Sequence, residues 1–499
     1  MANLKSLAKD TAIYGLSSII GRFLNYLLVP LYTAKMTAAS GGYGVITNVY
    51  AYTALLLVIL TYGMETTFFR FANKSEENPN TVYSTTLISV GTTSLLFVLL
   101  VLAFLPGISG WMGYAAHPEY IWVMAVVVAL DAFQAIPFAY LRFQRRPWKF
   151  AALKLLFIFL NIGLNLLYFV ALPALYKSHP DIVGKIYDPN IGVGYAFFIN
   201  LFCTGLITFF FWKELVGIKY KFDWSLLKRM LSYAWPLLIL GVAGILNQTF
   251  DKMMFPKIYT GADAQSQLGI YGGAVKIAMI MALITQAFRY AYEPFVFGKS
   301  REKDNRETYA QAMRFFIIFT LLAFLAVIAW IDVLKTLFLR NEDYWVGIKV
   351  VPIVMAAEIM MGIYFNLSFW YKLIDKTIWG AWFSGIGCAV LILVNVLFVP
   401  KYGYMACAWG GVAGYGTAMI LSYLVGQKYY PIKYPMRDIA LYTVVAAILF
   451  VAMLLPVENM WLKLAYRSVL LLLFIGLIYR KEKLGPMLSK VPVVGRFFK

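Results

Sequence analysis

Fourteen long apolar stretches, lying between residues 11 and 479, dominate this sequence. Each is close to the length of about 20 residues that an α-helix needs to cross the hydrocarbon core of a membrane. Apolar residues make up 61% of the 499 residues and charged residues only 14%, whereas a typical soluble domain has about 25% charged residues. Because a helix satisfies its own backbone hydrogen bonds, the sequence predicts an all-α polytopic membrane protein with about fourteen transmembrane helices.

The polar connections between these stretches leave no room for a soluble domain. The sequence contains no GxxxxGK[ST] loop, so ATP hydrolysis by this chain is not expected. The two histidines, His117 and His179, lie in polar connections without acidic residues or cysteines at ligand spacing. The three cysteines occur singly inside apolar stretches. We therefore expect no metal centre and no cofactor.

The charge distribution predicts an orientation. Lys and Arg number 44 against 24 Asp and Glu, giving a net charge of +20. Most of the basic residues fall in the connections on one side, together with both chain ends. The positive-inside rule assigns that side to the cytoplasm, so both termini are expected there. This bias accounts for the positive charge without a nucleic-acid partner. The N-terminal stretch has no small-residue cleavage site after a short core and is interpreted as an uncleaved first helix.

An internal repeat divides the chain. A Tyr-Gly pair at 43–44 recurs at 271–272, and an acidic residue follows each pair 22 positions after the tyrosine, at Glu65 and Glu293. We therefore expect two copies of a six-helix unit. Since six is an even number, both copies have the same orientation in the membrane. The predicted division is 1–229 for the first bundle, 230–430 for the second, 431–480 for helices 13 and 14, and 481–499 for a basic cytoplasmic tail.

Basic and amide side chains inside the predicted spans are candidates for substrate binding. Arg22 and Asn25 lie at helical spacing on one face of the first span. Lys276 and Arg289 lie in the eighth span, where Arg289 could instead be neutralised by Glu293 one turn later. A charge inside a bilayer is costly unless it faces a cavity or a partner. Cationic groups from both repeats would favour an anionic substrate, with phosphate as the best match.

Acidic side chains in the spans are candidates for ion coupling or gating. Because burial raises the pKa of a carboxyl group, a deep carboxylate suits coupling to protonation. The candidates are Asp131, Glu358, Asp251, Glu65 and Glu293. For Asp131 and Glu358, which lie deepest in their spans, the alternative is a structural ion pair with Arg22 or Lys276. For Asp251, the alternative is a solvated helix end.

Three segments carry a family resemblance. The stretches YGMETTFFRF at 62–71, LRFQRRPWKF at 141–150, and the segment from 271 to YAYEPF at 290–295 resemble the polysaccharide transporters, the bacterial flippases for O-antigen and capsule repeat units. These belong to the multidrug/oligosaccharidyl-lipid/polysaccharide exporter superfamily. The likeness extends over essentially the whole chain.

The resemblance implies both a fold and an activity. The family fold is two six-helix bundles that form a V around a central cavity. Its members move undecaprenyl-diphosphate-linked oligosaccharides across the bacterial cytoplasmic membrane by alternating access, in some cases coupled to H⁺ or Na⁺. Arg22 matches a basic cavity position of the family, and helices 13 and 14 resemble the pair that holds the lipid tail in lipid II flippases. The expected partners are the lipid-linked substrate, membrane lipids and, where an assembly forms, other polysaccharide-assembly proteins.

Several other functions are compatible with the sequence. A lipid II flippase and a multidrug or cation antiporter of the same superfamily are the nearest alternatives. A membrane-embedded enzyme would need a sizeable outer loop or a His/Asp pair within a span, so we predict that the chain is not an enzyme. A lipid scaffold without transport would show no conformational cycle.

Overall fold

The computed structural model describes residues 26–74, 76–299, 306–374 and 376–483. All regular secondary structure in these ranges is helical. Eleven helices are long and apolar enough to cross a membrane, which confirms the prediction of an all-α polytopic membrane protein. Of the three other predicted spans, the first lies mainly outside the described residues. The sixth corresponds to the shorter apolar helix Gly194–Phe209, and the twelfth to α21, which is not among the eleven.

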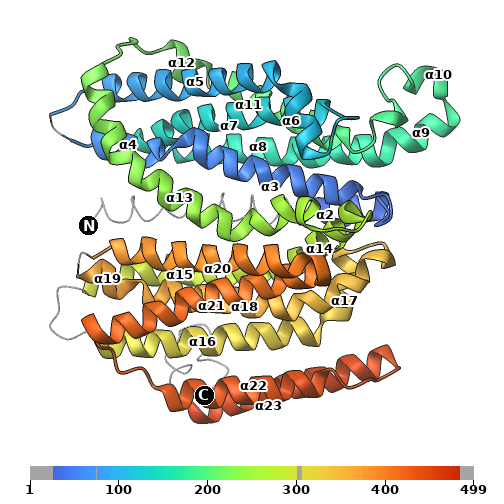
Figure 1. The fold of residues 1–499 in the computed structure, drawn as a ribbon, viewed down its shortest axis with the longest axis vertical. Helices are drawn as coiled ribbons and strands as arrows, with labels where there is room; N and C mark the ends of the chain where they lie inside the picture. The colour runs from blue at the N-terminus through green and yellow to red at the C-terminus, as the bar shows by residue number, and fades with distance from the viewer. Residues whose placement is uncertain (1–25, 75, 300–305, 375, 484–499) are drawn as a thin grey trace. The chain divides into compact units, whose positions relative to one another are not determined.

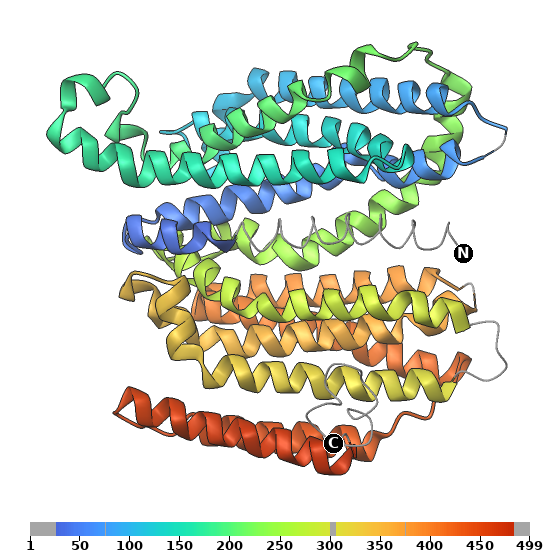
Figure 2. The same cartoon turned by 180° about the vertical axis from the view of Figure 1, so that it is seen from behind.

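The chain divides into two compact units, 1–272 and 273–499. This boundary follows packing, and it therefore differs from the boundary of the sequence repeat after residue 229. Figures 1 and 2 show the helices of the first unit in blue to green. They are α2 (Leu28–Lys35), α3 (Gly42–Thr61), α4 (Met64–Ala72), α5 (Pro79–Ala103), α6 (Leu105–Met112), α7 (Glu119–Phe143), α8 (Pro147–Leu166), α9 (Leu172–Ser178), α10 (Pro180–Val183), α11 (Gly194–Phe209), α12 (Trp212–Val216), α13 (Trp224–Ile258) and most of α14 (Ala264–Ala278).

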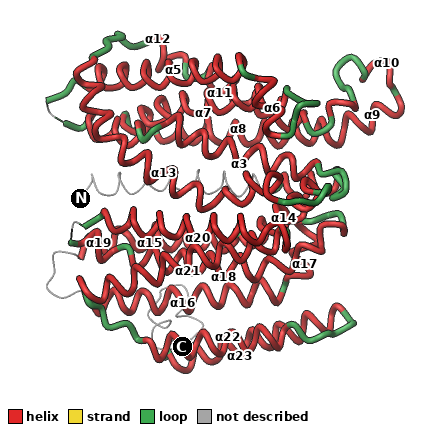
Figure 3. The backbone as a smooth tube through the Cα atoms, in the orientation of Figure 1, coloured by secondary structure: helices red, strands yellow, loops and turns green. Residues whose placement is uncertain are grey.

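The second unit is built in the same way, from long helices joined by short connections (Figure 3). Its helices are α15 (Ile280–Lys299), α16 (Arg306–Ala329), α17 (Ile331–Phe338), α18 (Val351–Leu367), α19 (Phe369–Leu373), α20 (Ile378–Tyr402), α21 (Tyr404–Tyr429), α22 (Met436–Met453) and α23 (Met460–Lys481). Among the described residues the longest helix is α13, which has 35 residues and lies in the first unit.

The second predicted span is broken into two helices. Tyr62 and Gly63 separate α3 from α4 and have φ angles of 33° and 72°. Glycine adopts this left-handed region without penalty, whereas a tyrosine is strained there. The break creates a new helix N-terminus at Met64, and Glu65 lies in the first turn of α4. A negative charge is favourable at that position because it complements the unpaired N–H groups and the helix dipole.

The two Tyr-Gly pairs of the repeat lie at one helix crossing in the first unit. A Cβ atom on Gly44 of α3 would approach the backbone oxygen of Gln265 in α14 to 1.8 Å. A Cβ atom on Gly272 of α14 would lie 2.6 Å from Oγ1 of Thr47 in α3. Both glycines are therefore required for close packing of α3 on α14. The first pair lies at the start of α3, whereas the second lies within its helix, because α14 begins at Ala264.

This crossing gives a first prediction. Gly44→Leu is expected to destabilise the protein by at least about 3 kcal/mol, since the added side chain meets backbone atoms that cannot rotate away. Gly163→Ala is the matched control, because nothing lies within 4 Å of a Cβ atom on that helical glycine. The control is expected to be neutral or stabilising by about 0.5–1 kcal/mol. Chemical unfolding in mixed micelles measures both, and equal stability of the two variants would contradict the close crossing.

Ion pairs hold the α22–α23 hairpin to the second unit near its turn. Arg467 of α23 is only 6% exposed, and its Nη1 lies 3.0 Å from Oδ2 of Asp332 in α17. Its Nε donates to the backbone oxygen of Met453, at 2.9 Å. Lys335 and Lys463 also pair with Asp332, at 2.8 and 2.9 Å. The Asp332 carboxylate thus joins α17 to α23 through Lys463 and Arg467, and it also pairs with Lys335 of its own helix.

A second ionic cluster holds the other end of the hairpin. Arg314 of α16 lies 3.4 Å from Asp438 of α22 and 3.0 Å from Glu482, the residue after α23. Lys481 pairs with Asp438 at 2.6 Å, and Tyr442 donates a hydrogen bond to Glu482 at 2.6 Å. The hairpin is therefore attached to the α16–α17 region at both of its ends.

Candidate functional site: charged side chains inside the first unit

Asp131 and Lys154 are opposite charges inside the first bundle. Asp131 lies in the middle of α7 and Lys154 two turns into α8, and both are half-buried. Each charge acts on the other. The Nζ atom of Lys154 also lies 4.0 Å from the ring centroid of Phe138, a cation–π contact that stabilises the ammonium group away from water. Lys154 thus acts electrostatically on Asp131 from the adjacent helix, an interaction that the spacing of residues did not suggest.

A second pair extends this arrangement. Arg142, in the last turn of α7, forms an ion pair with Glu65 in the first turn of α4. The guanidinium carbon of Arg142 lies 5.0 Å from the ring centroid of Phe69. Lys154 interacts electrostatically with both members of this pair. Two acids and two bases from three helices therefore form one charge network with no net charge.

Amide and hydroxyl groups continue the polar interior near Asp131. Asn200 of α11 donates to the hydroxyl of Tyr50 of α3, at 2.8 Å, and the charge of Asp131 acts on that tyrosine. Gln134, one turn after Asp131, donates to the backbone oxygen of Thr204 and to the hydroxyl of Thr208, at 2.8 and 2.7 Å. The interior of this bundle therefore contains a continuous polar region, in contrast to the apolar core of an ordinary helical bundle.

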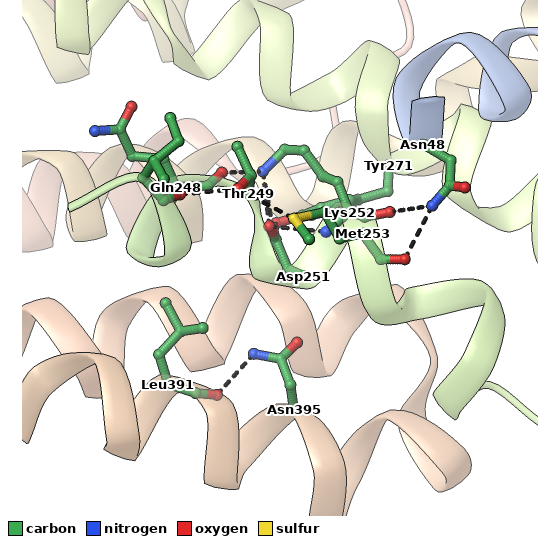
Figure 4. Close-up of polar contacts among 10 residues, drawn as sticks. Asn48, Gln248, Thr249, Asp251, Lys252, Met253, Tyr271, Leu391 and Asn395 are labelled. Atoms are coloured by element: carbon green, nitrogen blue, oxygen red, sulfur yellow. Dashed lines mark hydrogen bonds and ion pairs between the residues drawn. The ribbon is translucent and has the colours of Figure 1, made fainter. Parts of the chain in front are cut away.

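Asp251 belongs to a separate cluster on α13 (Figure 4). Its carboxylate accepts a hydrogen bond from Tyr271 at 2.6 Å and pairs with Lys252 at 2.9 Å. Nearby, Asn48 of α3 donates to the backbone oxygens of Lys252 and Met253, at 2.8 and 3.0 Å. Asp251 is only 8% exposed. The alternative of a solvated helix end is therefore wrong for this carboxylate.

The basic connection before α8 is largely paired with acidic side chains. Glu214 of α12 has a buried side chain that lies 2.6 Å from Lys149 and 3.7 Å from Arg146. Tyr83 donates to the backbone oxygen of Glu214 at 3.2 Å. These contacts give the connection a structural role in addition to its role in orienting the chain.

The predicted substrate-binding residues are described only in part. Arg22 and Asn25 lie outside the described residues. Lys276 is half-buried in α14, and Arg289 is exposed at the end of the described part of α15, with its guanidinium carbon 5.1 Å from the ring centroid of Phe365. Both have interacting partners.

The remaining predicted acidic residues differ in their surroundings. Glu358 is half-buried in α18 and also has an interacting partner. The side chain of Glu293 is outside the described residues, although α15 includes its backbone. The structure thus brings Asp131 and Glu65 into one network, and it places Asp251 in another.

Sequence reasoning missed Lys154 and Arg142 as members of the interior network. Both lie close to a basic connection between two predicted spans, where the positive-inside rule alone accounts for a lysine or an arginine. The signal that could have identified Lys154 is its position within an apolar helix, seven residues after Pro147 at the start of α8. A lysine at that depth requires an acidic or aromatic partner.

The chemistry of this network follows from its balance of charge. In the low dielectric of a membrane-spanning bundle, a proton added to either carboxyl group leaves a cation without its counter-charge. Lys154 interacts electrostatically with both acids.

Comparison with known proteins assigns the family. Residues 7–288, more than half of the chain, match the family described as polysaccharide biosynthesis protein. Lsg locus putative protein 1 of Haemophilus influenzae is 22% identical over 305 residues, which cover 59% of this chain and 67% of that protein.

Solved structures share the fold at low sequence identity. The lipid II flippase MurJ in an inward closed conformation is similar with a TM-score of 0.71 and 15% identity, over 94% of this chain and 98% of the flippase. A multidrug resistance MATE family transporter of the MOP superfamily, in an inward-facing conformation, gives a TM-score of 0.61 and 15% identity, over 85% and 96%. A multidrug resistance MATE family transporter of the MOP superfamily in an outward-facing conformation gives a TM-score of 0.58 and 15% identity, over 87% and 96%. The chain, with this all-α fold and with charged side chains inside its first bundle, belongs to the polysaccharide biosynthesis protein family.

Proposed function

We propose that this protein is a flippase that moves an undecaprenyl-diphosphate-linked oligosaccharide across the bacterial cytoplasmic membrane during synthesis of a cell-surface polysaccharide. The single observation that carries the proposal is membership of the polysaccharide biosynthesis protein family by a chain made of membrane-spanning helices. The fold similarity to a lipid II flippase adds support. Both termini lie in the cytoplasm in this proposal, in agreement with the distribution of Lys and Arg.

The proposed mechanism is alternating access between two six-helix bundles, 1–229 and 230–430, with helices 13 and 14 beside the second. The similarity to MATE family transporters in inward- and outward-facing conformations supports this cycle. Arg22 and Lys276 bind the diphosphate, with Asn25 and Arg289 nearby, and the prenyl chain stays in the lipid. Arg22 and Asn25 enter this mechanism from the sequence alone.

Coupling to H⁺ or Na⁺ is assigned to the acidic residues. Asp131 is the leading candidate, because Lys154, whose charge acts on it, also interacts with Glu65 and Arg142. Loss of that partnership would free Lys154 to move toward Glu65. Asp251, Glu358 and Glu293 are the further candidates for coupling or gating.

Binding of the substrate tests the proposal. An undecaprenyl-diphosphate-linked saccharide is expected to bind the purified wild type, and Arg22→Ala and Lys276→Ala are each expected to weaken binding by about 10- to 100-fold, as expected for loss of a charged hydrogen bond. Lys185→Ala, in an exposed connection, is the control and should bind like the wild type. Titration in detergent by microscale thermophoresis measures the affinities.

Other outcomes would support a different transporter. If the saccharide lipid does not bind and a lipophilic cation does, with loss on Asp131→Asn but not on Arg22→Ala, the protein is an antiporter of the multidrug type. The similarity to MATE transporters makes this the second candidate. If lipid II binds in preference to an oligosaccharide lipid, the substrate is the peptidoglycan precursor. Transport in proteoliposomes that is equal with and without an ion gradient would contradict coupling.

A further inference from the structure

A groove of about 540 Å³ lies between α5 and the first half of α13, within the first unit. Its α5 wall includes Ile88 and Thr92, and its α13 wall includes Trp224, Leu231 and Trp235. Figure 1 shows the first half of α13 beside α4, at the same end of the unit as the start of α5. The lining is mainly apolar, which suits a hydrocarbon chain better than a polar solute.

The length of the groove corresponds to one leaflet of a membrane. Its lining residues on α13 extend from Trp224 to Leu238, a distance of about 21 Å along the helix axis. Half of the hydrocarbon core measures about 15 Å. The groove therefore begins in the interfacial region and reaches the middle of the bilayer. Trp224, at its outer end, is 59% exposed, as expected for a tryptophan at a membrane interface.

The end of the groove near Trp224 is basic. Lys219, Lys221 and Lys228 are exposed there, and Nζ of Lys228 lies 5.9 Å from the ring centroid of Trp224. The chain segment that carries Lys221 is fixed to the start of α5, because Ser84 donates to its backbone oxygen at 2.6 Å. We call Lys219, Lys221 and Lys228 the rim lysines.

The nearby acidic groups do not cancel the charge of the rim lysines. Asp223 accepts a hydrogen bond from the backbone N–H of Leu226 at 3.0 Å, and it thereby caps the N-terminus of α13. Glu77 pairs with Arg229 at 2.6 Å. The rim lysines thus present positive charge at the depth where lipid phosphates lie.

We propose that this groove binds one acyl chain of an anionic phospholipid, whose phosphate is held by the rim lysines. An apolar channel of one-leaflet length with cationic groups at its interfacial end matches the two parts of such a lipid. The site lies entirely within the first unit and is separate from the charge network around Asp131. It does not depend on the flippase proposal.

The bound chain would touch the break between α3 and α4. Tyr62 lines the groove, and its hydroxyl lies 2.7 Å from the hydroxyl of Ser89 on α5. Since the backbone of Tyr62 is strained, with φ at 33°, packing of a lipid chain on its side chain stabilises the broken helix. The lipid would then act on the same segment that positions Glu65.

Photo-crosslinking tests the site. The probe is phosphatidylglycerol with a diazirine in one acyl chain, present at low fraction in phosphatidylcholine nanodiscs that hold the full-length protein. Crosslinks are expected on residues 88–93 and 224–238. Thr92→Trp fills the groove from α5 and should reduce these crosslinks about tenfold. Leu99→Trp is the matched control, because Leu99 lies on the same helix, is 55% exposed and does not line the groove; it should leave them unchanged.

The head-group part of the proposal has its own test. The double variant Lys221→Gln/Lys228→Gln should reduce crosslinking by phosphatidylglycerol about 30-fold, since each of the two basic residues contributes about 1 kcal/mol near an anionic lipid. Crosslinking by the matching phosphatidylcholine probe should not change. Equal labelling of Thr92→Trp and Leu99→Trp would overturn the site. Displacement of the probe by undecaprenyl phosphate but not by unlabelled phosphatidylglycerol would overturn the phospholipid assignment.

Discussion

Lys154→Met is expected to lower the free energy of unfolding by about 1–3 kcal/mol, because it removes a cationic side chain whose charge acts on the carboxylate of Asp131 inside a membrane-spanning bundle. The effect comes from a carboxylate that loses part of its compensating charge away from water. Chemical unfolding in mixed micelles at neutral pH measures it. Lys185→Met is the control, because its exposed lysine should change the stability by no more than about 0.5 kcal/mol.

The partner substitution separates the interaction from a loss of packing. Asp131→Asn in the Lys154→Met background removes the unpaired charge, so the double variant is expected to be more stable than Lys154→Met alone. Because Lys154 also interacts with Glu65 and Arg142, recovery should be incomplete. Asp131→Asn alone completes the comparison. If the loss in the double variant equals the sum of the losses in Lys154→Met and Asp131→Asn, the two charges do not act on one another.

Arg467→Met is expected to cost about 3 kcal/mol of unfolding free energy. The substitution removes hydrogen bonds to the backbone oxygen of Met453 and to Asp332 in a buried place, and of these acceptors Asp332 keeps its contacts with Lys335 and Lys463. Lys463→Met is the control on the same helix. Its more exposed ammonium group contributes less, about 1 kcal/mol or below. Equal losses in the two variants would contradict the central role given to Arg467.

The same cluster predicts a pH dependence. Asp332 lies in α17, after the span that ends at Ala329. Burial alone would raise the pKa of this carboxyl group, but hydrogen bonds from Lys335 and Lys463, and their charges, lower it to about 2. An unfolded aspartate has a pKa of about 3.9. The stabilisation is therefore fully present above about pH 4 and is lost as the pH falls toward 2.

Asp332→Asn makes this pH dependence measurable. The wild type is expected to exceed the variant by about 2–3 kcal/mol above pH 4, and the difference should shrink toward pH 2. Unfolding at a series of pH values in the same detergent gives the difference. A constant difference over that range would mean that Asp332 is not ionised in the folded protein.

Hydropathy predicted the helices well because a bilayer forces each spanning segment into a helix. It did not predict the break at Tyr62, since the apolar stretch continues through it. A tyrosine with a positive φ angle is held by its surroundings, here a hydrogen bond to Ser89 of another helix. Such contacts are long-range and leave no local pattern in the sequence.

The candidate site could be predicted only by residue type. Asp131, Glu65 and Asp251 were recognised because a carboxylate in an apolar stretch is conspicuous. Their partners were not recognised. Lys154 comes from a neighbouring helix, 23 positions after Asp131, and Tyr271 reaches Asp251 from another helix. The repeated Tyr-Gly pair, in contrast, marks a tight helix crossing, because Gly44 lies against α14 and Gly272 lies against α3.

The two ionic clusters at the ends of the α22–α23 hairpin have a consequence for spectroscopy. Because the hairpin is attached to α16 and α17 at both of its ends, it can neither slide along these helices nor move away from them. A nitroxide pair with one label on α16 and the other on α23 should therefore give a single, narrow distance distribution in every condition that leaves Asp332 and Asp438 ionised. The hairpin thus supplies a built-in distance standard, against which label pairs elsewhere in the chain can be calibrated when motion is measured.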